Sequence, residues 1–325
     1  MAQTGRDKLK IMVKIGLIIL LLCGLIGLFG LAGHQLVSKN AKMTMVASSF
    51  PGYDFLRELT RGDDSAEIKM LLIPGGEMHS FEPTPEDIKN IQNSKLFVYV
   101  GGESDKWIDG IISNLDLNKT KITRLVDLVE TVAEEHVDGM EENGHDEDAL
   151  EKDEHVWTNP VNAIEIIQKL KDALVQIDPE KKDFYEQNAN RYIAELNQLD
   201  AEIQKLVETA KRKEIIVGDR FPLRYFVDKY GLSYYAAFPG CSEQTEASAK
   251  TISFLIDKVR EDSIPVVFHM ELSNGKIAEA VARETGAKVL EINSAHNISQ
   301  EDFDKGLTYL DIMKNNIKVL KEALN

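Results

Sequence analysis

One long helical pattern, from Pro179 to about Arg212, divides this chain of 325 residues. No Pro or Gly interrupts it after Pro179, and apolar residues recur along it at helical spacings: Phe184, Tyr192, Leu196, Leu199, Ile203 and Leu206. At ~1.5 Å per residue, such a helix is about 50 Å long and can reach from one lobe of a protein to another. An ordinary surface helix is usually shorter, so the pattern predicts a rigid connecting helix over residues 179–213.

Short strands and helices alternate on the N-terminal side of this helix, over residues 41–178. The expected strands are 42–47, 68–73 and 96–100, and the expected helices are 53–59, 85–92, 107–114 and 161–175. Thr84 and Pro85 mark one helix start, because Thr caps a helix and Pro fits its first position. The alternation predicts a parallel, doubly wound sheet.

The same alternation restarts on the C-terminal side, over residues 214–325. The expected strands are 214–217, 232–237, 265–270 and 288–292, and the expected helices are 223–229, 247–260, 276–285 and a closing helical region from 303 onward. We therefore expect an α/β protein in which two doubly wound lobes are joined by a long rigid backbone helix. Two such lobes form a cleft that binds a ligand.

The first 40 residues are not expected to belong to either lobe. Four basic residues precede an apolar run over residues 15–32, close to the ~20 residues that span a bilayer. Because basic residues stay on the cytoplasmic side, the rest of the chain is predicted to be extracytoplasmic. Three fates are open for residues 1–32: cleavage after Ala32, lipidation at Cys23, or retention as a membrane anchor. The protein is thus expected to be tethered to the cell membrane by this segment, or secreted after cleavage.

The chain is acidic, with a formal net charge of −16. Such a charge repels nucleic acid and favours cations, so no nucleic-acid partner is expected. Residues 133–154 carry many carboxylates and no apolar periodicity, and they include His136 and His145. This acidic loop is interpreted either as a low-affinity metal trap or as a solvated linker.

Two histidines lie in loops beside prolines, each just before an expected helix: His79 in PGGEMHSFEPTP and His155 in HVWTNP. His79 also follows the expected strand 68–73, and ligands of doubly wound sheets bind beyond the carboxyl ends of the strands. Imidazole nitrogen is a preferred ligand of Zn²⁺ and its neighbours in the first transition series. The pair therefore predicts the first-lobe half of a metal site.

The second lobe offers four candidates for the other half of the site. Asp219 lies at the end of the expected strand 214–217, and His296 lies just past the strand 288–292. His269 ends a strongly apolar strand, where a buried core histidine is an equally good interpretation. Glu271 could bind the metal or orient another ligand. Asp219 and His296 are taken as the predicted ligands.

The sequence resembles the zinc- and manganese-specific solute-binding proteins of bacterial metal ABC transporters. The matching runs before the long helix are VASSFPGYDFLREL, PGGEMHSFEPTPEDI, LFVYVGGESDKWID and HVWTNP, and those after it are YFVDKYGL, TEASAKTISFLIDKV and ELSNGKIAEAVARETGAKVLEIN. The resemblance implies one metal between two lobes, with His79 and His155 as the first-lobe ligands. Where the family has a His or Glu before an aromatic-rich helix, this chain reads GDRFPLRYF, which leaves Asp219. The remaining ligand position of the family, after the last strand, leaves His296.

The resemblance implies capture of a divalent transition metal outside the cytoplasm and its delivery to an ABC transporter permease. Three histidines and one aspartate favour Zn²⁺, whereas more oxygen ligands would favour Mn²⁺, the alternative metal. The protein is expected to be a monomer and not an enzyme.

A zinc-dependent hydrolase is the alternative of a different class. Such an enzyme needs an open coordination position and a nearby general base. The chain has no HExxH run, and four ligands would close the site. A surface adhesin is a third possibility, for which the sequence indicates no specific partner.

Overall fold

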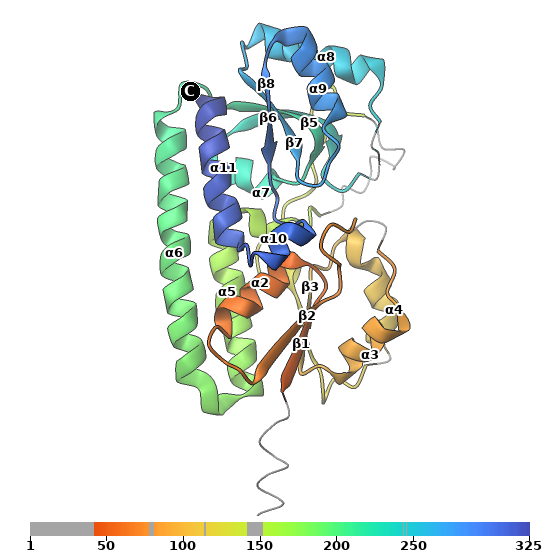
Figure 1. Cartoon of the computed structure of the whole chain (residues 1–325), viewed down its shortest axis with the longest axis vertical. Coiled ribbons are helices and arrows are strands. Elements are labelled where there is room, and N and C mark those ends of the chain that lie inside the picture. Colours follow the sequence, from red (N-terminus) through yellow and green to blue (C-terminus); the bar gives the residue numbers. More distant parts are fainter. Residues whose placement is uncertain (1–41, 78–80, 114, 142–151, 243, 245) are drawn as a thin grey trace, which may run out of the picture. The chain divides into compact units, whose positions relative to one another are not determined.

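The computed structural model describes residues 42–77, 81–113, 115–141, 152–242, 244 and 246–325. Thr44–Asn325 form one compact unit, which contains two α/β lobes (Figure 1). The expected export segment lies outside the described residues. No helix within the described ranges is long and apolar enough to cross a bilayer.

The first lobe is built on a four-stranded sheet in the order β2-β1-β3-β4. Its strands are β1 (Met43–Ala47), β2 (Ala66–Met70), β3 (Leu96–Tyr99) and β4 (Lys121–Arg124). β1, β3 and β4 run parallel, and Phe97 of β3 pairs with Val46 on one side and Ile122 on the other. β3 is buried along its whole length, as expected of a central strand in a parallel sheet with helices on both faces.

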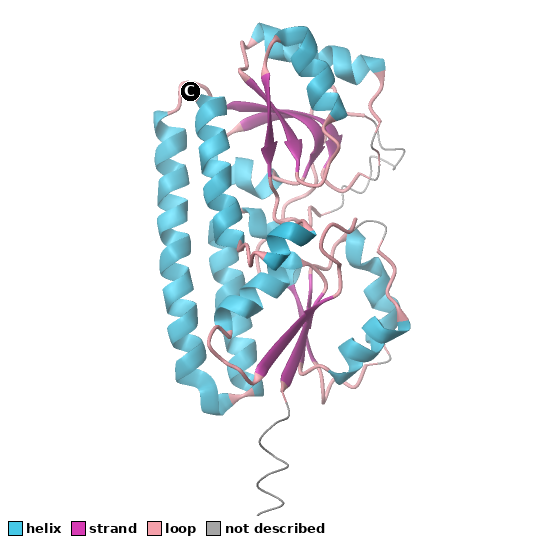
Figure 2. Cartoon of the chain, in the orientation of Figure 1, coloured by secondary structure: helices cyan, strands magenta, loops and turns pink. Residues whose placement is uncertain are grey.

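The second lobe repeats this strand order, with a four-stranded sheet β6-β5-β7-β8. Its strands, which all pair in parallel, are β5 (Glu214–Phe221), β6 (Ser233–Pro239), β7 (Val266–Met270) and β8 (Lys288–Ile292). Both sheets carry helices on their flanks (Figure 2). The predicted fold class of two doubly wound α/β lobes is therefore confirmed.

The helices mostly follow the predicted ranges. They are α2 (Phe50–Leu59), α3 (Pro85–Asn93), α4 (Asp109–Ile112), α5 (Pro160–Ile177), α6 (Lys182–Thr209), α7 (Arg224–Tyr230), α8 (Ala249–Glu261), α9 (Lys276–Thr285), α10 (Gln300–Asp304) and α11 (Tyr309–Leu324). Thr84 and Asp87 form the reciprocal capping box at the start of α3.

Four local predictions differ from the structure. The strand expected over 68–73 is β2, which begins and ends earlier, at Ala66–Met70. The helix expected over 107–114 is a 3-10 helix, Glu103–Ile108, followed by the short α4. β4 was not predicted, because its four residues KITR are too short and too charged to show an alternating pattern. β5 extends past residue 217 to Phe221, because its pairing with β6 resumes after a register shift.

Two helices, α6 and α11, run between the lobes. With 28 residues, α6 is about 42 Å long, and it buries one apolar stripe: Tyr185, Tyr192, Leu196, Leu199, Ile203 and Val207. α11 packs beside α6 (Figure 1). It begins at the first lobe, where the Tyr309 amide donates to Asp54 (2.8 Å). It ends beside the residues that join α6 to β5, where the Leu324 carbonyl accepts from the Lys211 amide (3.0 Å). The predicted connecting helix therefore has a second, shorter helix of 16 residues beside it, which also contacts both lobes.

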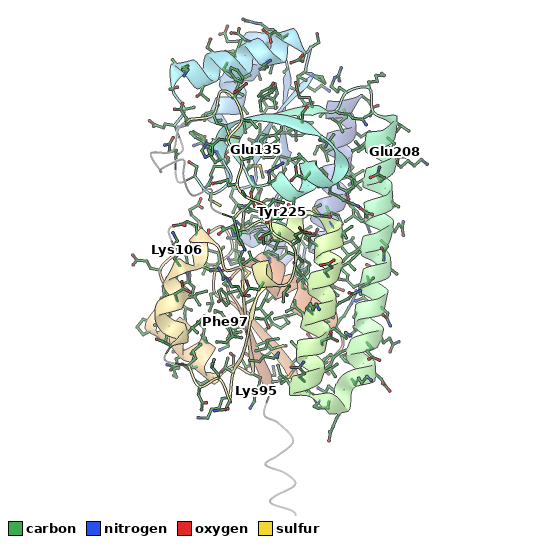
Figure 3. The ribbon with its side chains drawn as sticks, turned by 180° about the vertical axis from the view of Figure 1, so that it is seen from behind. Lys95, Phe97, Lys106, Glu135, Glu208 and Tyr225 are labelled. Carbon is green, nitrogen blue, oxygen red and sulfur yellow. The ribbon has the colours of Figure 1, made fainter. Side chains whose placement is uncertain are left out.

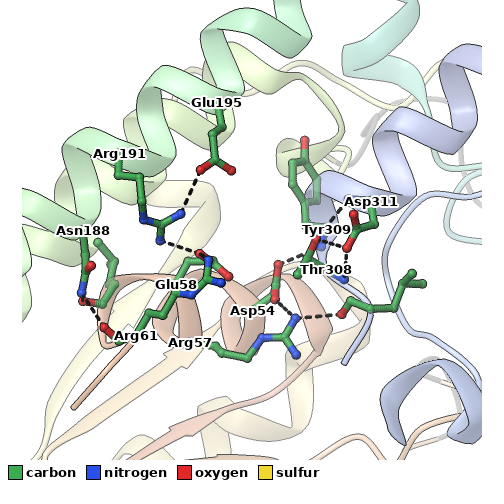
Figure 4. A network of polar contacts seen from close by, with 12 residues as sticks. Asp54, Arg57, Glu58, Arg61, Asn188, Arg191, Glu195, Thr308, Tyr309 and Asp311 are labelled. Atoms are coloured by element: carbon green, nitrogen blue, oxygen red, sulfur yellow. Dashed lines mark hydrogen bonds and ion pairs between the residues drawn. The ribbon is translucent and has the colours of Figure 1, made fainter. Parts of the chain in front are cut away.

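A polar network fastens both helices to α2 (Figure 4). Arg191 of α6 forms ion pairs with Glu58 of α2 (2.7 Å) and with Glu195 (3.0 Å). Asp54 of α2 is fully buried, and burial raises its pKa to about 6, although the adjacent Arg57 acts in the opposite direction. The first lobe is thus held on the connecting helices by charged groups as well as by apolar packing.

Candidate metal centre

His155 lies in the turn between the acidic loop and α5. Val156–Thr158 form one 3-10 turn, in which the Thr158 hydroxyl donates to the His155 carbonyl (2.9 Å). Asn159 then caps α5 by accepting from the Val161 amide (2.9 Å). The HVWTNP motif therefore encodes a tight entry into a helix, and this entry fixes the backbone at His155.

Asp153 orients the His155 imidazole. Its Oδ1 atom lies 2.8 Å from the His155 amide nitrogen and 3.0 Å from Nδ1. Burial by itself lowers the pKa of His155, but the charge and hydrogen bond of Asp153 and the charge of Glu154 outweigh it, so the pKa is raised above the ordinary 6.5. Because Nδ1 faces Asp153, Nε2 is the nitrogen that would bind a metal.

His296 lies in the turn Ser294–Ile298, which follows β8 and is called the His296 turn below. Ala295 adopts a positive φ of 60°, and its amide donates to Asn293 Oδ1 (2.7 Å). The His296 amide is 3.2 Å from Ser294 Oγ. A left-handed backbone is unfavourable for alanine, so these hydrogen bonds are needed to keep the turn in shape.

His155 and His296 meet between the two lobes. Their ring centroids are 5.2 Å apart and their planes are nearly perpendicular, at 84°. The indole of Trp157 packs against both rings, and its Nε1 donates to the Ser294 carbonyl of the second lobe (2.7 Å). Only 1% of His155 and 9% of His296 is exposed. The two lobes therefore contribute one imidazole each to a buried pair.

Glu154 completes a group of three possible metal donors. One ligand atom from each of Glu154, His155 and His296 lies within 4.8 Å of the other two, close enough to share one ion. Within the described part of the chain, no other three His, Cys, Asp or Glu residues form such a group. Two imidazoles and a carboxylate match the donor types that Zn²⁺ takes in proteins.

The Glu154 carboxylate is fully buried and has a partner in the first lobe. It accepts hydrogen bonds from the amide of Ser104 (3.1 Å) and from the Ser104 hydroxyl. Burial raises the pKa of Glu154, while the charge of His155 and the Ser104 hydrogen bonds oppose this without cancelling it. A bound cation would offset the same desolvation, so metal binding and ionisation of Glu154 favour each other.

Asp219, the predicted carboxylate ligand, is not part of this group. It lies inside β5, which is longer than predicted and continues to Phe221. Its Oδ1 accepts from the Arg220 amide (2.9 Å), and its Oδ2 faces the Met270 amide (3.4 Å). The structure thus brings together His155 and His296 of the predicted ligands, and adds Glu154.

The two alternative candidates have other contacts. His269 Nδ1 lies 3.0 Å from the Met270 carbonyl. Glu271 accepts from the Ser294 amide (2.9 Å) and from the Ser294 hydroxyl, and burial raises its pKa to about 7. Because Ser294 begins the His296 turn, these contacts suit the orienting role considered for Glu271.

His79 and His145 lie outside the described residues. The described residues just before His79 form a loop, Ile73–Glu77, which contacts the second lobe. The Asn297 side-chain amide donates to the carbonyls of Ile73 (2.9 Å) and Gly76 (2.8 Å). This loop therefore ends, two residues before His79 in the sequence, beside the turn that carries His296.

The described N-terminal end of the acidic loop contacts the second lobe, whereas Glu154 at its C-terminal end is bonded to Ser104 of the first. Glu134 accepts from the Cys241 amide (2.8 Å), and Glu135 forms an ion pair with Arg224 (3.1 Å). Figure 3 shows Glu135 and Tyr225 on the side of the second lobe. The Tyr225 hydroxyl donates to the Asp153 carbonyl (2.7 Å), next to the metal group.

Sequence reasoning missed Asp153 and Glu154 as site residues. Both directly precede His155 in the run KDEHVW, and that position was the available signal. In the sequence alone, they are indistinguishable from the many other carboxylates of the acidic loop. Burial, at 1% and 0% exposure, is what the structure adds for these two carboxylates.

Comparison with known proteins gives the family. The family model described as "Zinc-uptake complex component A periplasmic" matches residues 45–323. The chain therefore belongs to this family of extracytoplasmic components of metal-uptake complexes, which work with the permease of an ABC transporter. The resemblance noted in the sequence is confirmed, and so is the expectation of a binding protein rather than an enzyme.

Two relatives and one solved structure define the similarity more closely. The "High-affinity zinc uptake system protein ZnuA" of Bacillus subtilis is 32% identical over 290 residues, which cover 88% of this chain and 89% of that protein. The "Zinc-binding lipoprotein AdcA" of Streptococcus pneumoniae is 29% identical over 94% of this chain but only 60% of its own length. The crystal structure of the Zn(II)-bound ZnuA-like domain of AdcA from that species is 27% identical, with a TM-score of 0.72, and is matched over 87% of this chain and 99% of that domain.

Proposed function

We propose that this protein captures Zn²⁺ outside the cytoplasm and delivers it to the permease of an ABC transporter for uptake. The observation that carries the proposal is the buried group of Glu154, His155 and His296, whose donors come from both lobes. The names of the Bacillus relative and of the Zn(II)-bound AdcA domain support the same metal.

The proposed ligands are His79, His155 and His296, with Glu154 as the carboxylate. Asp219, the carboxylate expected from the sequence, is the alternative. Glu154 is favoured because it lies within 4.8 Å of both described histidines, whereas the Asp219 oxygens accept from backbone amides. Four protein ligands leave no open position for a reacting water, which suits cargo binding better than hydrolysis.

Zn²⁺ is preferred over Mn²⁺ because the set is rich in imidazole nitrogen. Oxygen-rich sites suit manganese, whereas imidazole suits zinc. Metal analysis of the purified protein after equilibration with equal Zn²⁺ and Mn²⁺ tests the proposal, with one Zn²⁺ per chain expected. Protein that retains no zinc would contradict the function, and protein that retains manganese instead would assign the alternative metal.

The carboxylate is assigned by a matched pair of isosteric changes, Glu154→Gln and Asp219→Asn. We expect Glu154→Gln to weaken zinc binding by more than about 100-fold, above the range for loss of an orienting partner, and Asp219→Asn to leave it within roughly twofold. Competition with a fluorescent chelator measures both affinities. The reverse ranking would return the carboxylate to Asp219.

The location and assembly are also proposed. The basic and apolar composition of residues 1–32 supports a tether to the outer face of the membrane, retained as an anchor or lipidated at Cys23. Membrane fractionation of the full chain and of Cys23→Ala tests this, because only a lipid tether is lost in the variant.

A monomer is proposed, and light scattering coupled to size-exclusion chromatography measures it.

A further inference from the structure

The loop Ile73–Glu77, called the 73–77 loop below, is held mainly by the opposite lobe. It leaves the end of β2, and its first residue, Ile73, is 69% exposed, so apolar burial does not fix it to its own lobe. Its Gly75 amide donates to the Ile298 carbonyl of the second lobe (2.7 Å). Loops without buried apolar contacts are mobile unless hydrogen bonds hold them, so these cross-lobe contacts decide where the loop lies.

Asn297 is the centre of this attachment. Its side-chain nitrogen donates to the carbonyls of Ile73 (2.9 Å) and Gly76 (2.8 Å), and its Oδ1 accepts from the Ile298 amide (2.9 Å). The residue is only 4% exposed, so water does not compete well for these bonds. Every polar atom of the amide is used, and only an amide in this orientation can donate to both carbonyls.

Arg220 adds a charged contact from β5. Its guanidinium forms a two-point ion pair with the Glu77 carboxylate, at 3.0 and 3.3 Å, and also approaches the Ser242 carbonyl (3.3 Å). Glu77 is half exposed, so solvent and salt weaken this pair. Arg220 is therefore expected to contribute less than Asn297.

We propose that Asn297 and Arg220 are positioning residues that hold the 73–77 loop on the His296 turn before metal arrives. The loop leads directly into His79, and Asn297 directly follows His296. The same contacts must open for a metal to leave, so they slow the escape of bound zinc. The zinc part of this inference rests on the proposed function, whereas the contact itself does not.

The contact is tested first without metal, in the full chain. We expect slow hydrogen exchange of the Gly75 amide in the wild type, because that amide is bonded to the Ile298 carbonyl. Asn297→Asp keeps the shape but turns both donors into acceptors facing carbonyls, so we expect roughly 10- to 30-fold faster exchange. Asn197→Asp, an exposed change on α6, is the matched control. Unchanged exchange at Gly75 in Asn297→Asp would overturn the inference.

The functional consequence is tested by stopped-flow removal of zinc with a chelator. We expect zinc loss to be about 10- to 30-fold faster in Asn297→Asp and about 2- to 5-fold faster in Arg220→Gln. Arg283→Gln, an exposed arginine on α9, should behave as wild type. The combined charge exchange Arg220→Glu with Glu77→Arg should restore the slow rate, which a loss of folding would not allow.

The melting temperature of each variant shows whether a faster zinc loss reflects the loop contact or a general loss of stability. We expect the melting temperature of Arg220→Gln to stay within a few degrees of the wild type. Wild-type rates in both Asn297→Asp and Arg220→Gln would overturn the positioning role. A wild-type protein that binds no zinc would instead overturn the proposed function, while the Gly75 exchange would still decide the loop contact.

Discussion

The turns that carry His155 and His296 supply the same side chain to one site, but they are built differently. His155 is fixed by its immediate neighbours: Asp153 orients the ring, and the turn into α5 fixes the backbone. His296 lies in a left-handed turn that is bonded to its own neighbours, Asn293 and Ser294, and is also held by residues far away in the chain, including Trp157 of the other lobe. A local motif can be read from the sequence, whereas a turn held by distant partners depends on the whole fold.

Removing either imidazole tests whether the two turns contribute equally to metal binding. We expect His155→Ala and His296→Ala each to weaken zinc binding by more than about 100-fold, above the range seen when only an orienting partner is lost. Calorimetric zinc titration measures both. Wild-type affinity in His296→Ala would remove the second lobe from the site and leave His155 without its partner.

Removing the orienting carboxylates comes next in size. Asp153→Asn should weaken zinc binding by about 10- to 100-fold, because the His155 ring loses the partner that fixes its orientation. Glu271→Gln should have a smaller effect, since the amide still accepts one bond from Ser294. Equal losses would mean that the His296 turn depends on its carboxylate as strongly as His155 does.

The raised pKa of His155 predicts opposite pH trends for zinc binding and for the stability of metal-free protein. A proton competes with zinc, so affinity falls as pH drops through the raised pKa. The Asp153–His155 ion pair stabilises the metal-free fold fully below the unfolded-state pKa of about 6.5, and this stabilisation is lost as pH rises through the folded-state pKa. Zinc titrations and denaturant unfolding between pH 5 and 9 measure the two trends. Asp153→Asn should shift both to lower pH, and trends of the same sign would contradict the assignment.

Trp157→Phe gives the smallest expected effect and tests the tie between the two turns. The change keeps a ring beside both histidines but removes the hydrogen bond to the Ser294 carbonyl. We expect a loss of about 1 kcal/mol in the free energy of unfolding. Urea denaturation measures it, with Trp107→Phe, which is 50 residues away in the chain, as a control for the chemical change. A larger loss in the control would show that ring packing, not the interlobe bond, dominates.

The helices and most strands followed from local patterns. α9 and β8 have the predicted bounds, because apolar periodicity and the following Gly286 specify the helix and a short apolar run after that glycine specifies the strand. β4 was missed because its strand character comes from pairing with β3 rather than from its own residues. β5 was predicted too short because its last residues pair only after a register shift, which no local pattern encodes.

The sequence by itself determined the two α/β lobes, the long helix between them and the motif that holds His155, because each depends on contacts within a few residues. The tertiary structure decided which carboxylate joins the histidines. Glu154 and Asp219 are equally acidic in the sequence, but only Glu154 is buried beside both rings, whereas Asp219 lies within a strand and accepts from backbone amides. Burial and the contact between two lobes depend on residues far apart in the sequence. They make Glu154 a candidate ligand, whereas Asp219 only accepts hydrogen bonds from the backbone.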